Sequence, residues 1–391
     1  MNSKVYLDYA STTPIDPKVL RDMVPYLRKE FGNASSVHGY GQRALAAVDQ
    51  ARGRVAEFLN CRADEVFFTG SATEADNLAI FGTVKALGGP QKKPHIIISS
   101  IEHHAVLEPC RVLQKEGAEV TFLPVDKEGL VSVSNLKKAL KDNTVLISII
   151  YANNEVGTIQ PIAEIGKVLK ERKKKIYFHT DAVQAANYLN CDIEKLGVDM
   201  LTLSSHKIYG PKGVGALFVK KGTPIEPMIY GGGHERGLRS GTENVAGIVG
   251  LGAAIKEAGS PKTEVNIVKV RQLRDKLIKK IPKLIPDAEL NGSLEKRLPN
   301  NVNFGFEGIE GEALLMALDQ KGFAVSTGSA CSSHNLESSH VLLALGIPEE
   351  KSHSSLRISL GKFNTDKEID RFLKVLPQVV GRLREISGYK K

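Results

Sequence analysis

Short apolar runs alternate with amphipathic stretches along the chain as far as residue 258. The runs are rich in β-branched residues and predict buried strands over residues 66–68, 95–99, 120–123, 145–151, 176–180, 199–204 and 214–219. Apolar residues at helical spacing predict helices over residues 73–87, 105–116, 135–140 and 162–173. Buried strands that alternate with helices are typical of a parallel sheet covered on both faces. We therefore expect an α/β fold with a mostly parallel seven-stranded sheet.

The pattern changes where Gly259, Ser260 and Pro261 indicate a break in the chain. A long charged helix is expected over residues 263–281, followed by mixed strands and helices. A last amphipathic helix is expected over residues 365–386. We predict a large domain over residues 16–260 and a smaller α+β domain formed by residues 1–15 and 261–391.

The composition is that of an ordinary globular protein, with 42% hydrophobic and 25% charged residues in a chain of 391. No apolar run at the start has the length of a signal peptide, and the run at 145–151 is too short to cross a bilayer. The four cysteines are scattered, which fits neither a disulfide framework nor a zinc site. We expect a cytoplasmic protein without membrane association.

Basic residues exceed acidic ones, 53 to 44, for a net charge of +9. The run 172–175 is the densest basic stretch, and a solvated helix end explains it better than a nucleic-acid patch. No interleaving of aromatic and basic residues suggests base stacking, so we expect no direct nucleic-acid partner. An acidic protein partner and an anionic cofactor fit the charge equally well.

Polar residues follow two of the predicted strands where ligands bind in parallel sheets, at the carboxyl ends. Lys207 lies in a turn after the strand ending at 204, where it is well placed for a covalent bond to a carbonyl cofactor. Ser204 and His206 beside it can donate to a phosphate. Asp181 precedes Lys207 by 26 residues and can pair with a protonated pyridine nitrogen, although a helix cap explains it equally well. Gln184 is close enough to reach the same ring.

Three more motifs follow predicted strands. Residues 69–74 open a helix, and Ser71 with Glu74 fits a capping box, so free amides at this helix start can bind phosphate. His103 can stack on a cofactor ring and shuttle protons, although a lone histidine is more often structural. Asn154 can offer an amide, or simply form a turn. Together the five motifs supply what pyridoxal phosphate requires.

Two further candidates lie in the second predicted domain. Cys331 is in the small, polar segment 326–335, where an exposed cysteine can become a thiolate nucleophile; the alternative is an incidental loop cysteine. Cys61, Cys110 and Cys191 have ordinary helix or strand-edge surroundings. Arg357 lies on a short predicted strand and can bind a substrate α-carboxylate through two donors, unless it forms a surface salt bridge.

As a set, these motifs resemble the cysteine desulfurases, in the class V aminotransferase branch of the fold-type I pyridoxal-phosphate enzymes. The resemblance extends almost from end to end, and the long segment around Cys331 is similar to group I, the iron–sulfur-assembly and nitrogenase type. The matching segments are 6–14, 70–74, 102–103, 153–155, 181–184, 204–207, 231–236, 239–242 and 328–331. Ala34 departs from the family, where proline is common. The sequence stops soon after Tyr389, and we expect it to lack the tail that some relatives use to bind a scaffold protein.

The resemblance implies a role for each candidate. Catalysis would fall to Cys331, Lys207 and His103. The cofactor would be pyridoxal 5'-phosphate, bound by Ala72, Thr73, His103, Asn154, Asp181, Gln184, Ser204, His206 and Lys207. Thr242 would complete the phosphate site of a neighbouring subunit, which implies a homodimer. Asn33, Asn154 and Arg357 would bind the substrate. No resident metal is expected, although Cys331 can be a transient ligand of an iron–sulfur cluster.

The activity implied is conversion of L-cysteine to L-alanine, with the sulfur passing as a persulfide on Cys331 to an iron–sulfur scaffold protein or another acceptor. One alternative is a selenocysteine lyase or another class V pyridoxal-phosphate enzyme. Another is a basic nucleic-acid-binding or scaffold protein.

Overall fold

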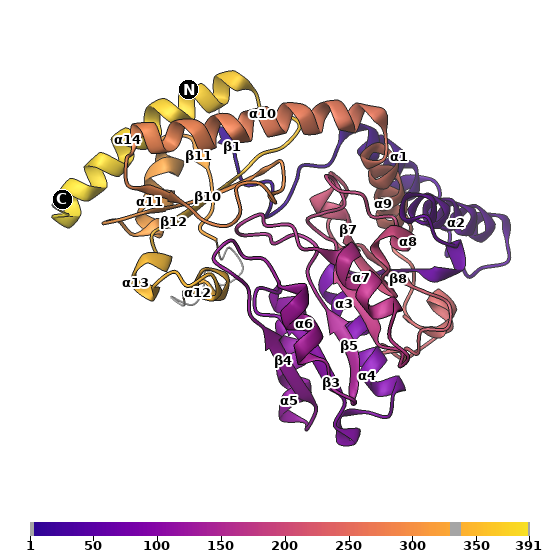
Figure 1. Ribbon diagram of the computed structural model, residues 1–391. Helices are drawn as coiled ribbons and strands as arrows, with labels where there is room; N and C mark the ends of the chain where they lie inside the picture. Colours follow the sequence, from indigo (N-terminus) through magenta and orange to yellow (C-terminus); the bar gives the residue numbers. More distant parts are fainter. Residues whose placement is uncertain (1–3, 329–337, 390–391) are drawn as a thin grey trace.

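The computed structural model describes residues 4–328 and 338–389 (Figure 1). All seven predicted strands form one sheet in the order β2-β8-β7-β6-β5-β3-β4. Only β8 runs antiparallel to its neighbours, so the prediction of a mostly parallel sheet is confirmed. The strands are β2 (Val66–Thr69), β3 (His95–Ser99), β4 (Glu119–Leu123), β5 (Thr144–Ser148), β6 (Tyr177–Asp181), β7 (Met200–Ser204) and β8 (Gly215–Val219).

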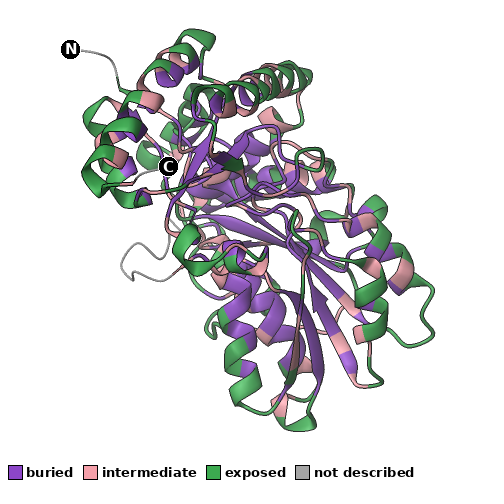
Figure 2. Cartoon of the chain, turned by 60° about the vertical axis from the view of Figure 1, so that its left-hand side comes forward, coloured by how far each residue is buried: buried purple, intermediate pink, exposed green. Residues whose placement is uncertain are grey.

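Helices cover both faces of the sheet because apolar side chains alternate along each strand. On β3, Ile97 packs toward α2 (Gly39–Leu59), α7 (Ile162–Lys170), α8 (Ile193–Leu196) and α9 (Val245–Ala258). Ile96 and Ile98 pack on the other face, in the core that contains α3 (Ala72–Asn77) and α5 (His104–Lys115). The strands are accordingly buried between exposed helix surfaces (Figure 2). Around this layer lie α1 (Pro17–Arg28) and α6 (Val133–Ala139).

Two predicted elements differ from those observed. The strand expected over 145–151 ends at Ser148, because the carbonyl of Tyr151 accepts from the amide of Gln160 and the chain turns back. The helix expected over 73–87 changes to a π-helical turn at Leu78–Gly82 and continues as α4 (Thr83–Ala86). At Gly82 a Cβ would come within 2.6 Å of the carbonyl oxygen of Glu226, a close approach that a count of apolar positions does not reveal.

A second core lies between the C-terminal elements and the start of the chain. The antiparallel sheet β12-β10-β9 packs with α10, α11 and α14, and β1 pairs in parallel with β11. The boundaries at 15/16 and 260/261 stay a prediction. The elements are β1 (Val5–Tyr6), α10 (Pro261–Leu284), β9 (Ala288–Leu290), β10 (Asn301–Phe306), α11 (Gly311–Gln320), β11 (Phe323–Ala324), α12 (His340–Ala344), α13 (Glu349–Ser352), β12 (Ser355–Ser359) and α14 (Asp366–Ser387).

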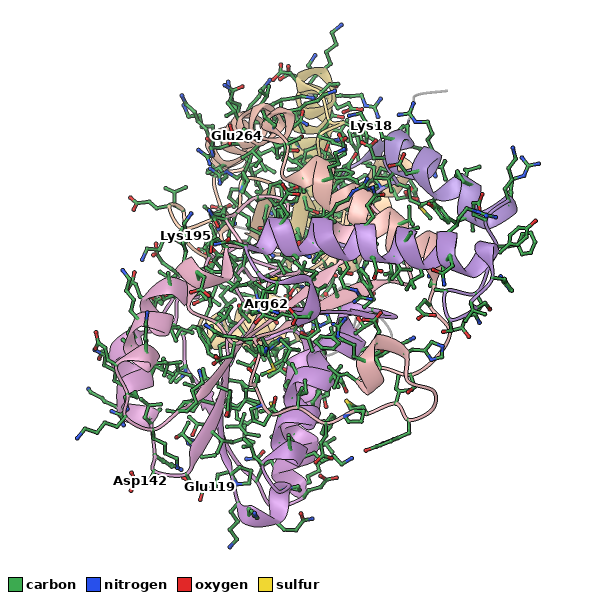
Figure 3. All side chains as sticks on the ribbon, turned by 90° about the vertical axis from the view of Figure 1, so that its right-hand side faces the viewer. Lys18, Arg62, Glu119, Asp142, Lys195 and Glu264 are labelled. Carbon is green, nitrogen blue, oxygen red and sulfur yellow. The ribbon has the colours of Figure 1, made fainter. Side chains whose placement is uncertain are left out.

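Charged side chains lie mainly on the outside. Glu119, Asp142 and Lys195 are exposed and point away from the body of the molecule (Figure 3). The basic run 172–175 follows the end of α7 and is exposed, as expected for a solvated helix end. Within residues 4–328 and 338–389, no helix has the length and apolarity needed to cross a membrane.

Candidate active site

The carboxyl ends of β2, β3, β5, β6 and β7 meet at one edge of the sheet, because these strands run in the same direction. A cavity of about 330 Å³ opens there. This is the place and size at which parallel sheets bind small ligands. Ten predicted site residues line it: Ala72, Thr73, His103, Asn154, Asp181, Gln184, Ser204, His206, Lys207 and Arg357.

Lys207 and Asp181 bring opposite charges to this cavity. Lys207 ends a 3-10 turn that follows β7, and its Nζ donates to the carbonyl oxygens of Ala10 and Ser11, each at 2.6 Å. Asp181 is the last residue of β6 and accepts from the amide of Val183 at 2.8 Å. Burial raises the pKa of Asp181 to about 6, while the Val183 amide and the charge of Lys207 oppose that rise. At neutral pH the carboxyl is therefore mostly ionised.

The start of α3 forms one side of the cavity. Ser71 caps the helix by accepting from the amide of Glu74 at 3.1 Å, as the capping pattern predicts. The carboxylate of Glu74 reaches the amide of Gly70 at 2.9 Å, one residue before the expected partner. The first-turn amides of Ala72 and Thr73 precede the first intrahelical hydrogen bond and are directed outward from the helix end. Backbone amides in this position suit a phosphate group.

Both predicted site histidines are neutral near pH 7. Burial lowers the pKa of His103 to about 4, with a further contribution from Lys207. Its Nδ1 accepts from the amide of Ala105 at 3.1 Å, so the proton of the neutral ring is on Nε2. Burial and Lys207 likewise lower the pKa of His206 to about 4, and its Nδ1 lies 3.1 Å from Oγ1 of Thr12. The neutral ring of His103 therefore has a donor at Nε2.

Arg357 enters the cavity from β12 and is 2% exposed. Its Nη1 donates to the backbone carbonyl of Asn154 at 3.0 Å. Its Nη2 donates to Oδ1 of Asp8 at 2.9 Å and to Oγ of Ser11 at 2.7 Å. The alternative of a surface salt bridge is therefore wrong, because the pair with Asp8 is largely buried. Gln184 donates to the carbonyl of Ala10 at 2.9 Å.

Two predicted residues are not brought into this cavity, and a third lies outside the described residues. Asn33 lies in the α1–α2 connection and accepts from the amide of Ser35 at 2.9 Å. Thr242 lines a separate cavity of about 110 Å³. Cys331 is in the segment 329–337, which lies outside the described residues.

Sequence reasoning missed several residues of the site. Ala10 and Ser11 line the cavity and bind Lys207, although the segment 6–14 was noticed only as a family motif. Asp76 also lines the cavity; burial and nearby Asp181 raise its pKa well above the usual value. Asp76 follows Thr73 by three residues, so both lie on one helix face, a signal that was available in the sequence. Burial raises the pKa of Glu102, next to His103, to about 8.

Residues on both sides of the segment 329–337 line the cavity or contact a residue that lines it. Gly328 lines the cavity so closely that a Cβ there would be 2.6 Å from Oε2 of Glu155. Ser339 donates to the same carboxylate oxygen at 2.5 Å. His340 also lines the cavity, with Nε2 at 2.9 Å from the carbonyl of Glu102.

The chain is similar to known proteins over nearly its whole length. The family model Aminotransferase class-V matches residues 5–372. Cysteine desulfurase IscS of Dictyoglomus turgidum is 50% identical over 391 residues, 100% of this chain and 98% of that protein. A solved NifS-like protein has a TM-score of 0.90 and 38% identity, covering 97% of this chain and 100% of that one. SspA in complex with cysteine has a TM-score of 0.81 and 37% identity, covering 93% of this chain and 100% of that one.

The chain therefore belongs to the aminotransferase class-V family. Its half-identical relatives within that family are cysteine desulfurases, so the class predicted from the sequence motifs is confirmed.

Proposed function

We propose that this protein is a pyridoxal-phosphate-dependent cysteine desulfurase that converts L-cysteine to L-alanine and keeps the sulfur on Cys331. The observation that supports it best is the convergence of Lys207, Asp181, His103 and Arg357 on one cavity. A lysine, a buried carboxylate, a neutral histidine and a carboxylate-binding arginine are the groups that chemistry on an amino acid requires.

The cavity fits the cofactor by the chemistry of its donors. The carboxylate of Asp181 suits the ring nitrogen, and Lys207 supplies the amine for the covalent bond. Ser204, His206 and the amides of Ala72 and Thr73 suit the phosphate. When bound, pyridoxal phosphate supplies an electron sink for the bonds around the substrate Cα.

The remaining steps belong to the chain's own residues. Arg357 binds and orients the substrate α-carboxylate through donors of its buried guanidinium. Lys207 would hold the cofactor through its amine and, as a base, would take the proton from the substrate Cα. His103 is uncharged near neutral pH and carries its proton on Nε2, from which it can donate.

Cys331 is the proposed nucleophile. Burial raises the pKa of Cys61 and of Cys191 to about 12 and raises that of Cys110 as well, so these thiols stay protonated and weakly nucleophilic. Before the segment that contains Cys331, Gly328 lines the cavity, and after it Ser339 donates to Glu155, which also lines the cavity. Its thiolate attacks the substrate sulfur, the Cβ–S bond breaks, and the electron pair stays with the carbon that is then protonated. Alanine leaves, and Cys331 keeps a persulfide.

A homodimer and a sulfur acceptor complete the proposal. Thr242 lies outside the cavity and is available to a neighbouring subunit's phosphate site. Large apolar side chains around the α1–α2 connection are exposed, with Leu27 at 62%, Phe31 at 73% and Val37 at 91%. Burial of such side chains favours association. The acceptor we propose is an iron–sulfur scaffold protein or another thiolation protein.

The test is alanine released from L-cysteine with a thiol reductant, by the wild type and by Cys331→Ala. Alanine from the wild type and almost none from the variant is expected. Equal release from both would make the enzyme a lyase that does not use Cys331. No alanine from the wild type, although it binds pyridoxal phosphate, would reject L-cysteine as the substrate.

A further inference from the structure

The guanidinium of Arg357 is already paired with a carboxylate of the protein. Both hydrogens of Nη2 are used, one by Asp8 at 2.9 Å and one by Ser11 at 2.7 Å. Nη1 makes one hydrogen bond, to the carbonyl of Asn154 at 3.0 Å. Nε is buried and has no hydrogen-bond partner among residues 4–328 and 338–389. Arg357 thus keeps donors on Nε and Nη1 for a ligand, but its positive charge is already paired with the carboxylate of Asp8.

Asp8 cannot easily withdraw from this contact. The residue forms an isolated bridge with Ser359 on β12. On either side, Ser359 donates its amide to the carbonyl of Leu7 at 2.8 Å, and its Oγ accepts from the amide of Ala10 at 2.8 Å. The carbonyl of Asp8 itself accepts from the hydroxyl of Tyr6 at 2.9 Å. The backbone of Asp8 is therefore fixed to the strand that carries Arg357, which holds the carboxylate within reach of the guanidinium.

We propose that Asp8 is a positioning residue that limits the affinity of Arg357 for carboxylate ligands and thereby favours release of the amino-acid product. This inference rests on the proposed function, in which Arg357 binds the α-carboxylate. Asp8 contacts Arg357 from outside the residues that line the cavity, so its charge acts through the guanidinium and not by blocking the site.

The physical reason is repulsion between two carboxylates that share one cation. In a largely buried site, the second carboxylate gains less from a guanidinium that is already neutralised, and the two negative charges repel each other. Asp8 also lowers the cost of keeping Arg357 buried when no substrate is bound. A site without this charge would bind cysteine and alanine alike more tightly and would release alanine more slowly.

The test is the dissociation constant of L-alanine for the holoenzyme, measured by titration calorimetry. Asp8→Asn keeps the size and an oxygen acceptor but removes the charge, and we expect alanine to bind about 10-fold more tightly, as for ~1.4 kcal/mol. Asp8→Glu keeps the charge and is expected to stay within twofold of the wild type. Ser11→Ala removes a neutral partner of the same Nη2 and is expected to show no gain. The KM for L-cysteine should fall in parallel with the alanine constant for Asp8→Asn.

A merely structural role for Asp8 predicts the opposite sign, because a damaged site binds less tightly. Unchanged or weaker alanine binding by folded Asp8→Asn would overturn the inference. If that variant does not fold, Asp8→Ser also removes the charge and is judged by the same criterion. The proposed function fails separately, if wild-type holoenzyme makes no alanine from L-cysteine.

Discussion

The two walls of the cavity are built in different ways. One wall is the edge of the parallel sheet, where Asp181, Ser204 and Lys207 sit at or directly after strand ends that hydrogen bonds on both sides hold in place. The other wall joins residues far apart in sequence, such as Ser11 and Arg357, which are 346 positions apart and share a hydrogen bond. The groups proposed for chemistry thus lie on the sheet. Arg357, which is proposed to bind the substrate, lies where the N-terminal segment pairs with β12.

The largest expected effect is on the sheet wall. Lys207→Ala removes the proposed covalent anchor and base, so alanine production from L-cysteine should fall by about 10³-fold, within the range for loss of a catalytic acid or base. Lys212→Ala changes an exposed lysine five positions on and is expected to leave the rate within twofold. Comparable losses in both variants would contradict the assignment of Lys207.

The next effect is on the opposite wall. Arg357→Gln removes a hydrogen-bonded charge worth roughly 1.5–3 kcal/mol, so kcat/KM for L-cysteine should fall about 10- to 150-fold, mainly through KM. Steady-state kinetics separates the two parameters. Arg382→Gln, at an exposed position of α14, is the matched control. A loss confined to kcat would move Arg357 from substrate binding to chemistry.

The pH dependence of stability reports on the buried acids behind the sheet wall. Burial raises the pKa of Glu102 to about 8, so the folded state retains a proton that the unfolded state loses. The contribution of Glu102 to the free energy of unfolding is complete below its unfolded pKa of 4.5 and is lost as the pH rises through 8. Urea unfolding between pH 7 and pH 8, where the buried histidines are neutral in the folded and the unfolded state, should show stability falling with pH, by up to about 1.4 kcal/mol per pH unit from this group.

Glu102→Gln should flatten that slope without removing it, because Asp76, whose pKa burial raises well above its usual value, contributes in the same direction. An unchanged slope would show that Glu102 is ionised in the folded protein.

The smallest effect concerns the hydrogen bond between Thr12, in the N-terminal segment, and His206. Thr12→Val removes the hydroxyl that lies 3.1 Å from Nδ1 of His206. A neutral hydrogen bond contributes about 0.5–1.5 kcal/mol, so affinity for pyridoxal phosphate should fall about 2- to 12-fold. Fluorescence titration of the cofactor-free protein with pyridoxal phosphate measures this affinity. A much larger loss would mean that the N-terminal segment helps to form the phosphate site.

The sequence predicted the sheet wall well, because each of its residues follows a local apolar run. The strand-to-turn pattern at Lys207 and at Asp181 is visible without any knowledge of the fold. The opposite wall was predicted only in part. Arg357 was recognised, but its partner Asp8 was not. No local pattern connects residues 8 and 357, since their contact depends on the pairing of the chain's start with β12. Asp76 was missed although its helical spacing from Thr73 was readable.

The most direct test of the account is to identify the residue that binds pyridoxal phosphate. The holoenzyme is reduced with borohydride, digested and analysed by peptide mass spectrometry. The proposed active site predicts one modified lysine, Lys207, and no retained cofactor in Lys207→Ala. Modification at another lysine, or an equally modified Lys207→Ala protein, would contradict the proposed active site.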